Sequence, residues 1–113
     1  MAKMRVILEL GSGNDLHGSD YTKAALRAVQ DALHHSSLSF IRSLNIDKGK
    51  LEVEVTVGVQ QPEQVDLQAV KNSLPVGSVT VWAVKGGLDV ADSENNDTAV
   101  IASAAIAVRI EVT

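Results

Sequence analysis

The residues whose types and spacing could support chemistry lie in one glycine-rich segment, residues 11–18, with the sequence GSGNDLHG. Asp15 and His17 are two residues apart, so in an extended backbone their side chains project to the same side, as metal chelation requires. A carboxylate and an imidazole are suitable ligands for a divalent ion such as zinc, manganese or magnesium. The spacing therefore predicts a metal site at Asp15 and His17 that needs further ligands from elsewhere.

A third metal ligand has several possible sources in the sequence. His34 and His35 are the obvious candidates, but they lie about 14 residues along the following helix from its start, or ~20 Å at a rise of ~1.5 Å per residue. Asp20, the segment 89–97, a substrate or a neighbouring subunit could supply the ligand instead. The competing interpretation is structural, with the carboxylate bonded to loop amides and the imidazole exposed in a turn.

The glycines of the same segment support a second hypothesis, an anion site. Glycines allow positive φ and close backbone approach, and a glycine loop that opens onto a helix N-terminus presents free amides to an anion. The segment matches neither a dinucleotide fingerprint nor a P-loop, and turn formation explains its glycines equally well. The candidate anion- or ligand-binding residues are Gly11, Ser12, Gly13, Gly18, Lys85 and Gly86.

Strands and helices alternate along the chain in an arrangement that could position these groups. Apolar residues recur with the period of a strand or of a helix in successive segments. The pattern predicts strands over 4–10, 51–59, 79–84 and 99–112, a helix over 20–36, a short helix from Pro62 or Asp66 to Pro75, and a polar loop over 89–97. Trp82, in the third strand, is expected in the core.

The predicted order, β-α-β-α-β-β, has a consequence for where a site would form. With right-handed parallel crossovers, the first three strands point the same way and their carboxyl ends meet at one edge of the sheet. That edge would collect residues 11–18, 60–62 and 85–89. Ligands of α/β sheets bind outside the carboxyl ends of strands, so the sequence predicts a site built from three distant segments.

The composition predicts a single domain, residues 1–113, with a core of small side chains. Hydrophobic residues make up 45% of the chain and include 16 Val and 13 Ala, but there is only one residue each of Phe, Tyr and Trp. A domain of this size buries only about two-thirds of its unfolded surface. We therefore expect an oligomer interface to add to the stability of the fold.

Charge and hydropathy exclude several classes of partner. The net charge is −4 and the ten Lys and Arg residues are scattered, so nucleic acid is not an expected partner. The chain contains no Cys, which excludes disulfides and thiolate metal sites. No stretch approaches the ~18 apolar residues of a spanning helix, and the N-terminus lacks a signal h-region. A cytoplasmic protein without membrane contact is expected.

Residues 11–18 match the GxGxDxHG signature of a small family of uncharacterised hypothetical proteins. Residues 22–25 and 28–29 also resemble that family, and the resemblance covers the whole chain. It implies no particular activity.

A more distant resemblance is to methylerythritol cyclodiphosphate synthase, a metal-dependent enzyme of isoprenoid biosynthesis. That enzyme begins with a strand and a GxGxDxH loop whose Asp and His bind the metal, and these match Asp15 and His17. Residues 55–62 are similar to its strand that ends in Ala-Gln-x-Pro-Lys at the nucleotide pocket. Residues 84–87 and 101–108 resemble its last hairpin.

The chain departs from the synthase at residues that matter for activity. It has no separate copy of the synthase's His-Ser-Asp-Gly-Asp segment, which carries the third ligand, and Glu63 replaces a pocket lysine and would repel a diphosphate. Synthase activity is therefore not predicted. The resemblance implies an α+β, chorismate-mutase-like two-layer sandwich with a mixed sheet and two helices on one face. It also implies homotrimers with sites between subunits.

Two functional hypotheses follow from these observations. The first is a homo-oligomer, with a trimer favoured, that carries an interfacial metal or small-anion site at residues 11–18 and acts as a lyase or hydrolase on a small metabolite. The alternative is a non-catalytic ligand-binding or assembly protein in which residues 11–18 are structural.

Overall fold

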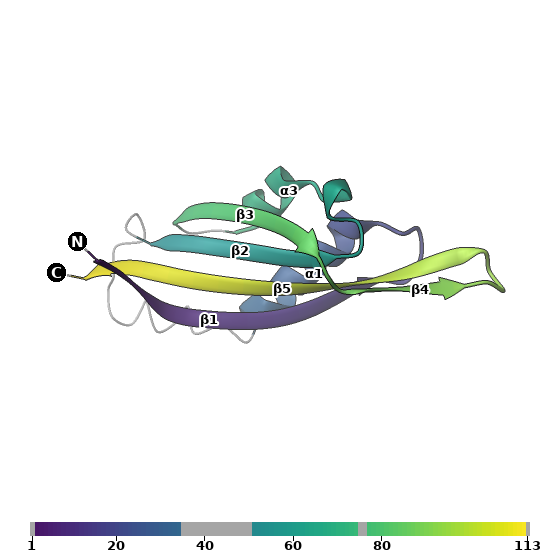
Figure 1. Ribbon diagram of the computed structural model, residues 1–113, viewed down its shortest axis with the longest axis horizontal. Coiled ribbons are helices and arrows are strands. Elements are labelled where there is room, and N and C mark those ends of the chain that lie inside the picture. Colours follow the sequence, from purple (N-terminus) through teal and green to yellow (C-terminus); the bar gives the residue numbers. More distant parts are fainter. Residues whose placement is uncertain (1, 35–50, 75–76, 113) are drawn as a thin grey trace.

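The computed structural model describes residues 2–34, 51–74 and 77–112, which form one mixed sheet with helices (Figure 1). The strands are β1 (Ala2–Asp15), β2 (Glu52–Val59), β3 (Ser78–Lys85), β4 (Leu88–Asp92) and β5 (Asp97–Val112). The helices are α1 (Tyr21–His34), α3 (Leu67–Asn72) and a 3-10 turn, η2 (Pro62–Gln64). The candidate ligand His35, the end of the helix predicted over 20–36 and Pro75 lie outside the described residues.

The sheet has the strand order β1-β5-β2-β3. β5 is antiparallel to both β1 and β2, and β2 is parallel to β3. The first three strands therefore point the same way, as the sequence predicted. The fold is α+β, with a mixed five-stranded sheet and two helices. No helix among the described residues is long and apolar enough to cross a membrane.

A β-hairpin replaces the polar loop predicted over residues 89–97. β4 pairs antiparallel with the start of β5, from Leu88 opposite Ile101 to Asp92 opposite Asp97. The prediction was wrong because the polar residues of this segment are stabilised by strand pairing, which composition does not report. The hairpin extends beyond the rest of the sheet in Figure 1.

The first strand is longer than predicted and includes most of the glycine segment. Pairing with β5 continues through Gly11, Ser12 and Gly13 to Asp15. The two glycines face α1. A Cβ added at Gly11 would lie 2.4 Å from the Ala32 backbone nitrogen, and one added at Gly13 would lie 2.3 Å from the Ala28 nitrogen. These glycines therefore allow strand and helix backbones to touch, and residues 11–13 do not form the predicted open loop.

Small aliphatic side chains fill the space between α1 and the sheet, as the composition predicted. Ala24, Ala28 and Val29 of α1 are fully buried. They form one cluster with strand valines such as Val55 and Val57, which are also fully buried. Because alanine adds little bulk, the helix lies close to the strands, and α1 is seen behind them in Figure 1.

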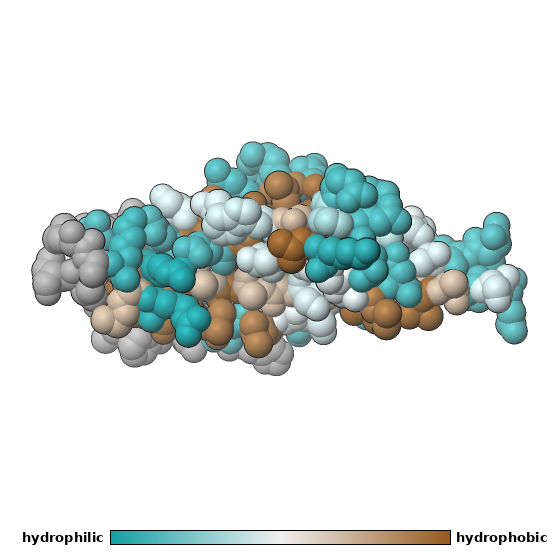
Figure 2. All heavy atoms as spheres, in the orientation of Figure 1, coloured by the Kyte–Doolittle hydropathy of each residue, from teal (hydrophilic) through white to brown (hydrophobic). Residues whose placement is uncertain are grey.

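The opposite face of the sheet, which we call the open face, carries exposed apolar side chains. Leu10 is 64% exposed and Trp82 is 47% exposed, so the prediction that Trp82 lies in the core was wrong. The alternation of β3 places Trp82 on the face away from both helices, while its neighbours Val81 and Ala83 pack against the core. Figure 2 shows apolar residues interspersed with polar ones on the side of the molecule that it displays.

Candidate functional site

Asp15 is the last residue of β1 and the one buried charged residue of the described chain, with 3% of its surface exposed. Its Oδ2 accepts a hydrogen bond of 3.0 Å from the backbone amide of Asp20. Its Oδ1 lies 3.8 Å from Lys23 Nζ and 3.7 Å from an Arg27 guanidinium nitrogen. The carboxylate thus joins the end of β1 to the first two turns of α1, where opposite charges offset the cost of its burial.

His17 has a different environment from Asp15. Its side chain is 83% exposed, and its Nδ1 lies 3.3 Å from Oδ2 of Asp97, at the start of β5. The other Asp97 oxygen accepts hydrogen bonds from the amides of Thr98 and Gly18, at 2.8 and 3.3 Å. These backbone hydrogen bonds, together with His17, hold the pKa of Asp97 below its ordinary value of 3.8.

The structure does not bring Asp15 and His17 together as one pair of ligands. The chain turns between β1 and α1, where Gly18 and Ser19 have φ of 92° and 52°. Asp15 faces α1 and is buried, whereas His17 is exposed and contacts the start of β5. In the part of the chain that the structure describes, no three His, Cys, Asp or Glu side chains cluster as a metal site requires.

The predicted anion-binding residues are distributed over two places in the sheet. The Ser12 amide donates a hydrogen bond of 2.9 Å to Oδ2 of Asp31 on α1, so an acidic side chain already binds it. Lys85 ends β3, and the next residue, Gly86, donates its amide to Val59 O at 2.9 Å.

The ends of β2 and β3 do meet, as predicted for this edge of the sheet. Gln60 Nε2 donates to the carbonyl of Gly86 at 3.0 Å, and a Cβ on Gly58 would lie 3.4 Å from the Gly86 Cα. These contacts bring the segments 60–62 and 85–87 together. β5 separates them from residues 11–13 of β1.

No pattern in the sequence predicts a contact between Tyr21 and Asp89, which are 68 residues apart. Tyr21, 5% exposed at the start of α1, donates its hydroxyl to Oδ2 of Asp89 on β4 at 2.5 Å. The hydrogen bond to Asp89 and burial raise the pKa of Tyr21 to about 12. The contact fastens the hairpin to α1, and no residue spacing predicts it because it depends on where β4 lies.

The contact with Asp89 should be detectable when the Tyr21 hydroxyl is titrated at alkaline pH. Tyr21 is the only tyrosine in the chain, so tyrosinate absorbance reports on this one group. We expect its ionisation near pH 12, compared with about 10 in the unfolded chain. Because the folded-state pKa is raised, the stabilisation from this contact is complete below pH 10 and is lost as pH rises towards 12. An Asp89→Asn variant should ionise at lower pH, and an unchanged midpoint would contradict the contact.

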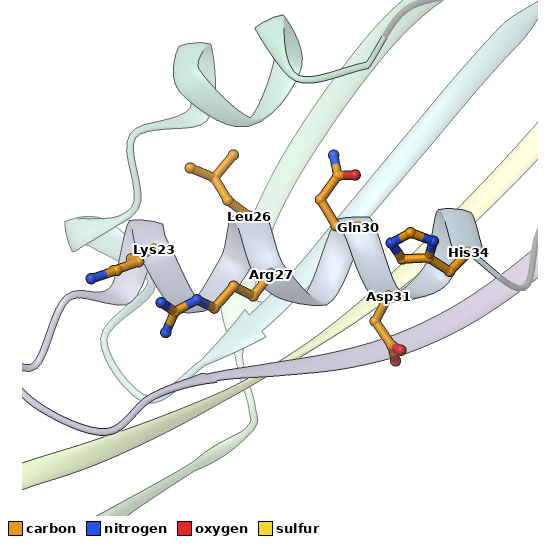
Figure 3. Close-up of a pocket in the computed structure, with 6 residues that line it drawn as sticks. All are labelled: Lys23, Leu26, Arg27, Gln30, Asp31 and His34. Atoms are coloured by element: carbon orange, nitrogen blue, oxygen red, sulfur yellow. The ribbon is translucent and has the colours of Figure 1, made fainter.

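A shallow groove of about 370 Å³ lies along the outer side of α1 and is lined by Lys23, Leu26, Arg27, Gln30, Asp31 and His34 (Figure 3). Two of its charged side chains, Arg27 and Asp31, form hydrogen bonds between α1 and the backbone of β1. Arg27 donates to the carbonyl of Asn14 at 2.7 Å, and Asp31 binds the Ser12 amide. The groove is therefore a consequence of the strand–helix contact, and its polar groups are not directed towards a common ligand.

Comparison with known proteins finds one similar solved structure and one matching protein family. No curated protein matches the chain. The crystal structure of an FtsZ-like protein of unknown function from Nostoc punctiforme PCC 73102 is similar, with 38% sequence identity and a TM-score of 0.86, and the match covers 99% of each chain. A family model matches residues 5–108. The predicted relation to uncharacterised hypothetical proteins is therefore confirmed, while the resemblance to the cyclodiphosphate synthase stays a prediction. The chain belongs to a family of conserved hypothetical proteins, Lin0512_fam.

Proposed function

We propose that this chain is a homo-oligomeric assembly protein in which residues 11–18 are a structural connection. The observation that carries this proposal is the open face of the sheet, whose large apolar side chains no helix of the described chain covers. The contacts of residues 11–18 support it. Gly11 and Gly13 admit α1, Asp15 holds the first turns of the helix, and the Gly18 amide is bonded to β5.

The dimensions of the chain also support association. Its accessible surface is 6667 Å², whereas a compact monomer of 11.9 kDa is expected to expose about 5,900 Å². Its radius of gyration is 15.4 Å, compared with about 13 Å for a compact domain of this length. A sheet with helices on one face and an extended hairpin leaves extra surface that a neighbouring chain can bury.

We favour three copies in the assembly. The mixed sheet with antiparallel β5 is compatible with the chorismate-mutase-like architecture that the sequence resemblance implies. Homotrimers of that architecture bring their sheets together. A closed ring of three leaves no open-ended contact, as is usual for soluble homo-oligomers.

The test of this proposal is the mass of the wild-type protein in solution. Sedimentation velocity of untagged protein at micromolar concentration should give about three times the 11.9 kDa mass of one chain. A protein that sediments as a monomer throughout this range would contradict the assembly function.

A second candidate function is a divalent-metal site completed by a neighbouring chain, on which lyase or hydrolase chemistry would depend. The observation in its favour is the pair formed by His17 and Asp97, two ligand types held 3.3 Å apart near the protein surface. Zinc and manganese are suited to an imidazole and a carboxylate. Asp15 fits this site less well, because its carboxylate already binds the Asp20 amide.

Calorimetric titration of untagged wild-type protein with Zn²⁺ or Mn²⁺ tests the metal function. If the site exists, we expect about one ion per chain or per interface, binding abolished in His17→Ala, and binding retained in Asp15→Asn. Binding that is absent in the wild type, or unchanged in His17→Ala, would exclude this site.

A further inference from the structure

The open face of the sheet has the relief of a valley between two apolar ridges. Leu8 and Leu10 form one ridge on β1, and Trp82 and Val84 form the other on β3. The pairing register connects them through short side chains, since Leu10 lies opposite Ala105, Ala105 opposite Thr56, and Thr56 opposite Trp82. A groove of about 380 Å³ follows the valley and is lined by Leu10, Gly11, Thr56, Gly58, Val84, Ser103, Ala104 and Ala105.

Both ridges expose large apolar side chains to solvent. Leu8 is 46% exposed, and Val84 is 47% exposed on the other side of the valley. Leu88 and Val90 continue this apolar surface along the hairpin, because Leu88 pairs with Ile101 of β5 and Val90 is two residues further along β4. Large exposed apolar side chains on both sides of a groove are typical of a protein interface.

The outer edge of β3 points to the same conclusion. From Ser78 to Val84 this edge strand contains no charged residue and no proline, and Lys85 is its only charge. Natural sheets usually protect an exposed edge with lysine, proline or a bulge. β1, at the other edge, has such protection from Arg5 and the irregular pairing between Arg5 and Ile7. Within the described residues, the sequence of β3 offers no such protection before Lys85, which favours a neighbour on the Trp82 side of the face.

The balanced charges of the face favour a second copy over a highly charged partner as the occupant. The charged groups at one end of the open face balance one another: Lys3 pairs with Glu52 and Arg109 with Glu54, and the register adds one cation, Arg5, and one anion, Glu111. They leave no net charge that would attract an oppositely charged partner. Each copy offers both a ridge and a valley, so the ridge of one chain fits the small-residue valley of the next.

The size of the face is adequate for a specific interface. Four strands ~4.8 Å apart and about eight residues long present roughly 500 Å² of projected area, and the hairpin adds more. Accessible area exceeds projected area because the ridge side chains stand out from the sheet. A standard interface uses about 800 Å² of accessible surface per partner.

From these observations we infer that a second copy of this chain docks on the open face, with Leu10 and Trp82 as the central apolar anchors in the valley of its neighbour. This inference rests on the proposed homo-oligomeric function and assigns the surface that mediates it.

Charge substitutions on and off the face test the inference. In Leu10→Glu and Trp82→Glu, a carboxylate replaces an anchor that association would remove from water, so we expect the oligomer to dissociate at concentrations at least ~30-fold higher than in the wild type. Leu67→Glu is the matched control, because Leu67 is 42% exposed on α3, away from the open face. All three changes are at exposed positions, and circular dichroism verifies that each variant is folded.

Fluorescence of the wild type gives an independent measurement that requires no variant. Trp82 is the only tryptophan, so its emission should shift to longer wavelength as dilution dissociates the oligomer. An oligomer that resists both face substitutions, or that dissociates with no change in Trp82 emission, would overturn the inference while leaving the oligomeric function intact. A monomeric wild type would overturn both.

Discussion

Replacement of Gly13 by alanine should lower the free energy of unfolding by about 3 kcal/mol, at the upper end of the usual cost of overpacking. The new Cβ would lie 2.3 Å from the Ala28 nitrogen and 2.6 Å from the Arg27 carbonyl carbon, which are backbone atoms that no side-chain rotation can move. Helix α1 must therefore shift away from β1 and lose part of its contact with the sheet. Since small domains are stable by only about 5–15 kcal/mol, this is a large fraction of the total.

Urea denaturation of Gly13→Ala and of a matched control measures this effect. Ser12→Ala is the control, because Ser12 is adjacent in β1 but exposed on the other face of the sheet. The hydrogen bond to Asp31 comes from the Ser12 backbone amide, so it does not require the Ser12 side chain. The control should remain within about 0.5 kcal/mol of the wild type. If Gly13→Ala is as stable as the control, the glycines are not required for helix packing and the anion-site hypothesis gains support.

Replacement of Asp15 by alanine should cost about 2 kcal/mol, the second largest effect that we expect. The change removes a charged acceptor from the Asp20 amide, and hydrogen bonds to charged groups contribute about 1.5–3 kcal/mol. It also leaves Lys23 and Arg27 without their common counter-ion, although both are about half exposed and this loss is small. Asp15→Asn, which keeps an acceptor oxygen, should lose about 1 kcal/mol or less.

Two measurements separate this structural role of Asp15 from metal binding. His17→Ala should leave stability nearly unchanged, because the imidazole is 83% exposed. A chelator such as EDTA should leave the unfolding midpoint of the wild type unchanged. A chelator-induced loss of stability that disappears in both Asp15→Ala and His17→Ala would instead show that the two residues share a metal.

Gly13 and Asp15 belong to the same segment, residues 11–18, which connects β1, α1 and the hairpin. Its glycines set how closely α1 approaches, and Asp15 fixes where the helix begins. Its last residues contact Asp97 at the start of β5, so the segment also lies against the hairpin. A motif of this kind can persist for folding reasons alone, without any ligand.

The sequence predicted the directions of the strands and the nature of the core. Alternating valines of β2 identify one buried face, and the recurring alanines of α1 identify a helix that must lie close to a sheet. Both signals are local, because strand and helix periods are read from neighbouring residues. The right-handed crossover rule then aligned the first three strands correctly.

The candidate site could not be predicted to the same extent, because local patterns have more than one tertiary outcome. The two-residue spacing of Asp15 and His17 places them on one side only if the strand continues, but β1 ends at Asp15 and the chain turns at Gly18. Glycines in a loop and glycines beneath a helix also look alike in sequence. The position of Ala28 against Gly13 distinguishes them.

The amino-acid sequence by itself determined which segments form strands with one buried face, that small side chains fill the core, and which strands are parallel. These properties follow from local periodicity, composition and chain connectivity. The tertiary structure alone decided that Trp82 is exposed on the face of the sheet that the helices do not cover. It also decided that Tyr21 contacts Asp89 across 68 residues. The physical reason is that burial depends on what packs against a residue, and these partners are brought together only by the complete fold.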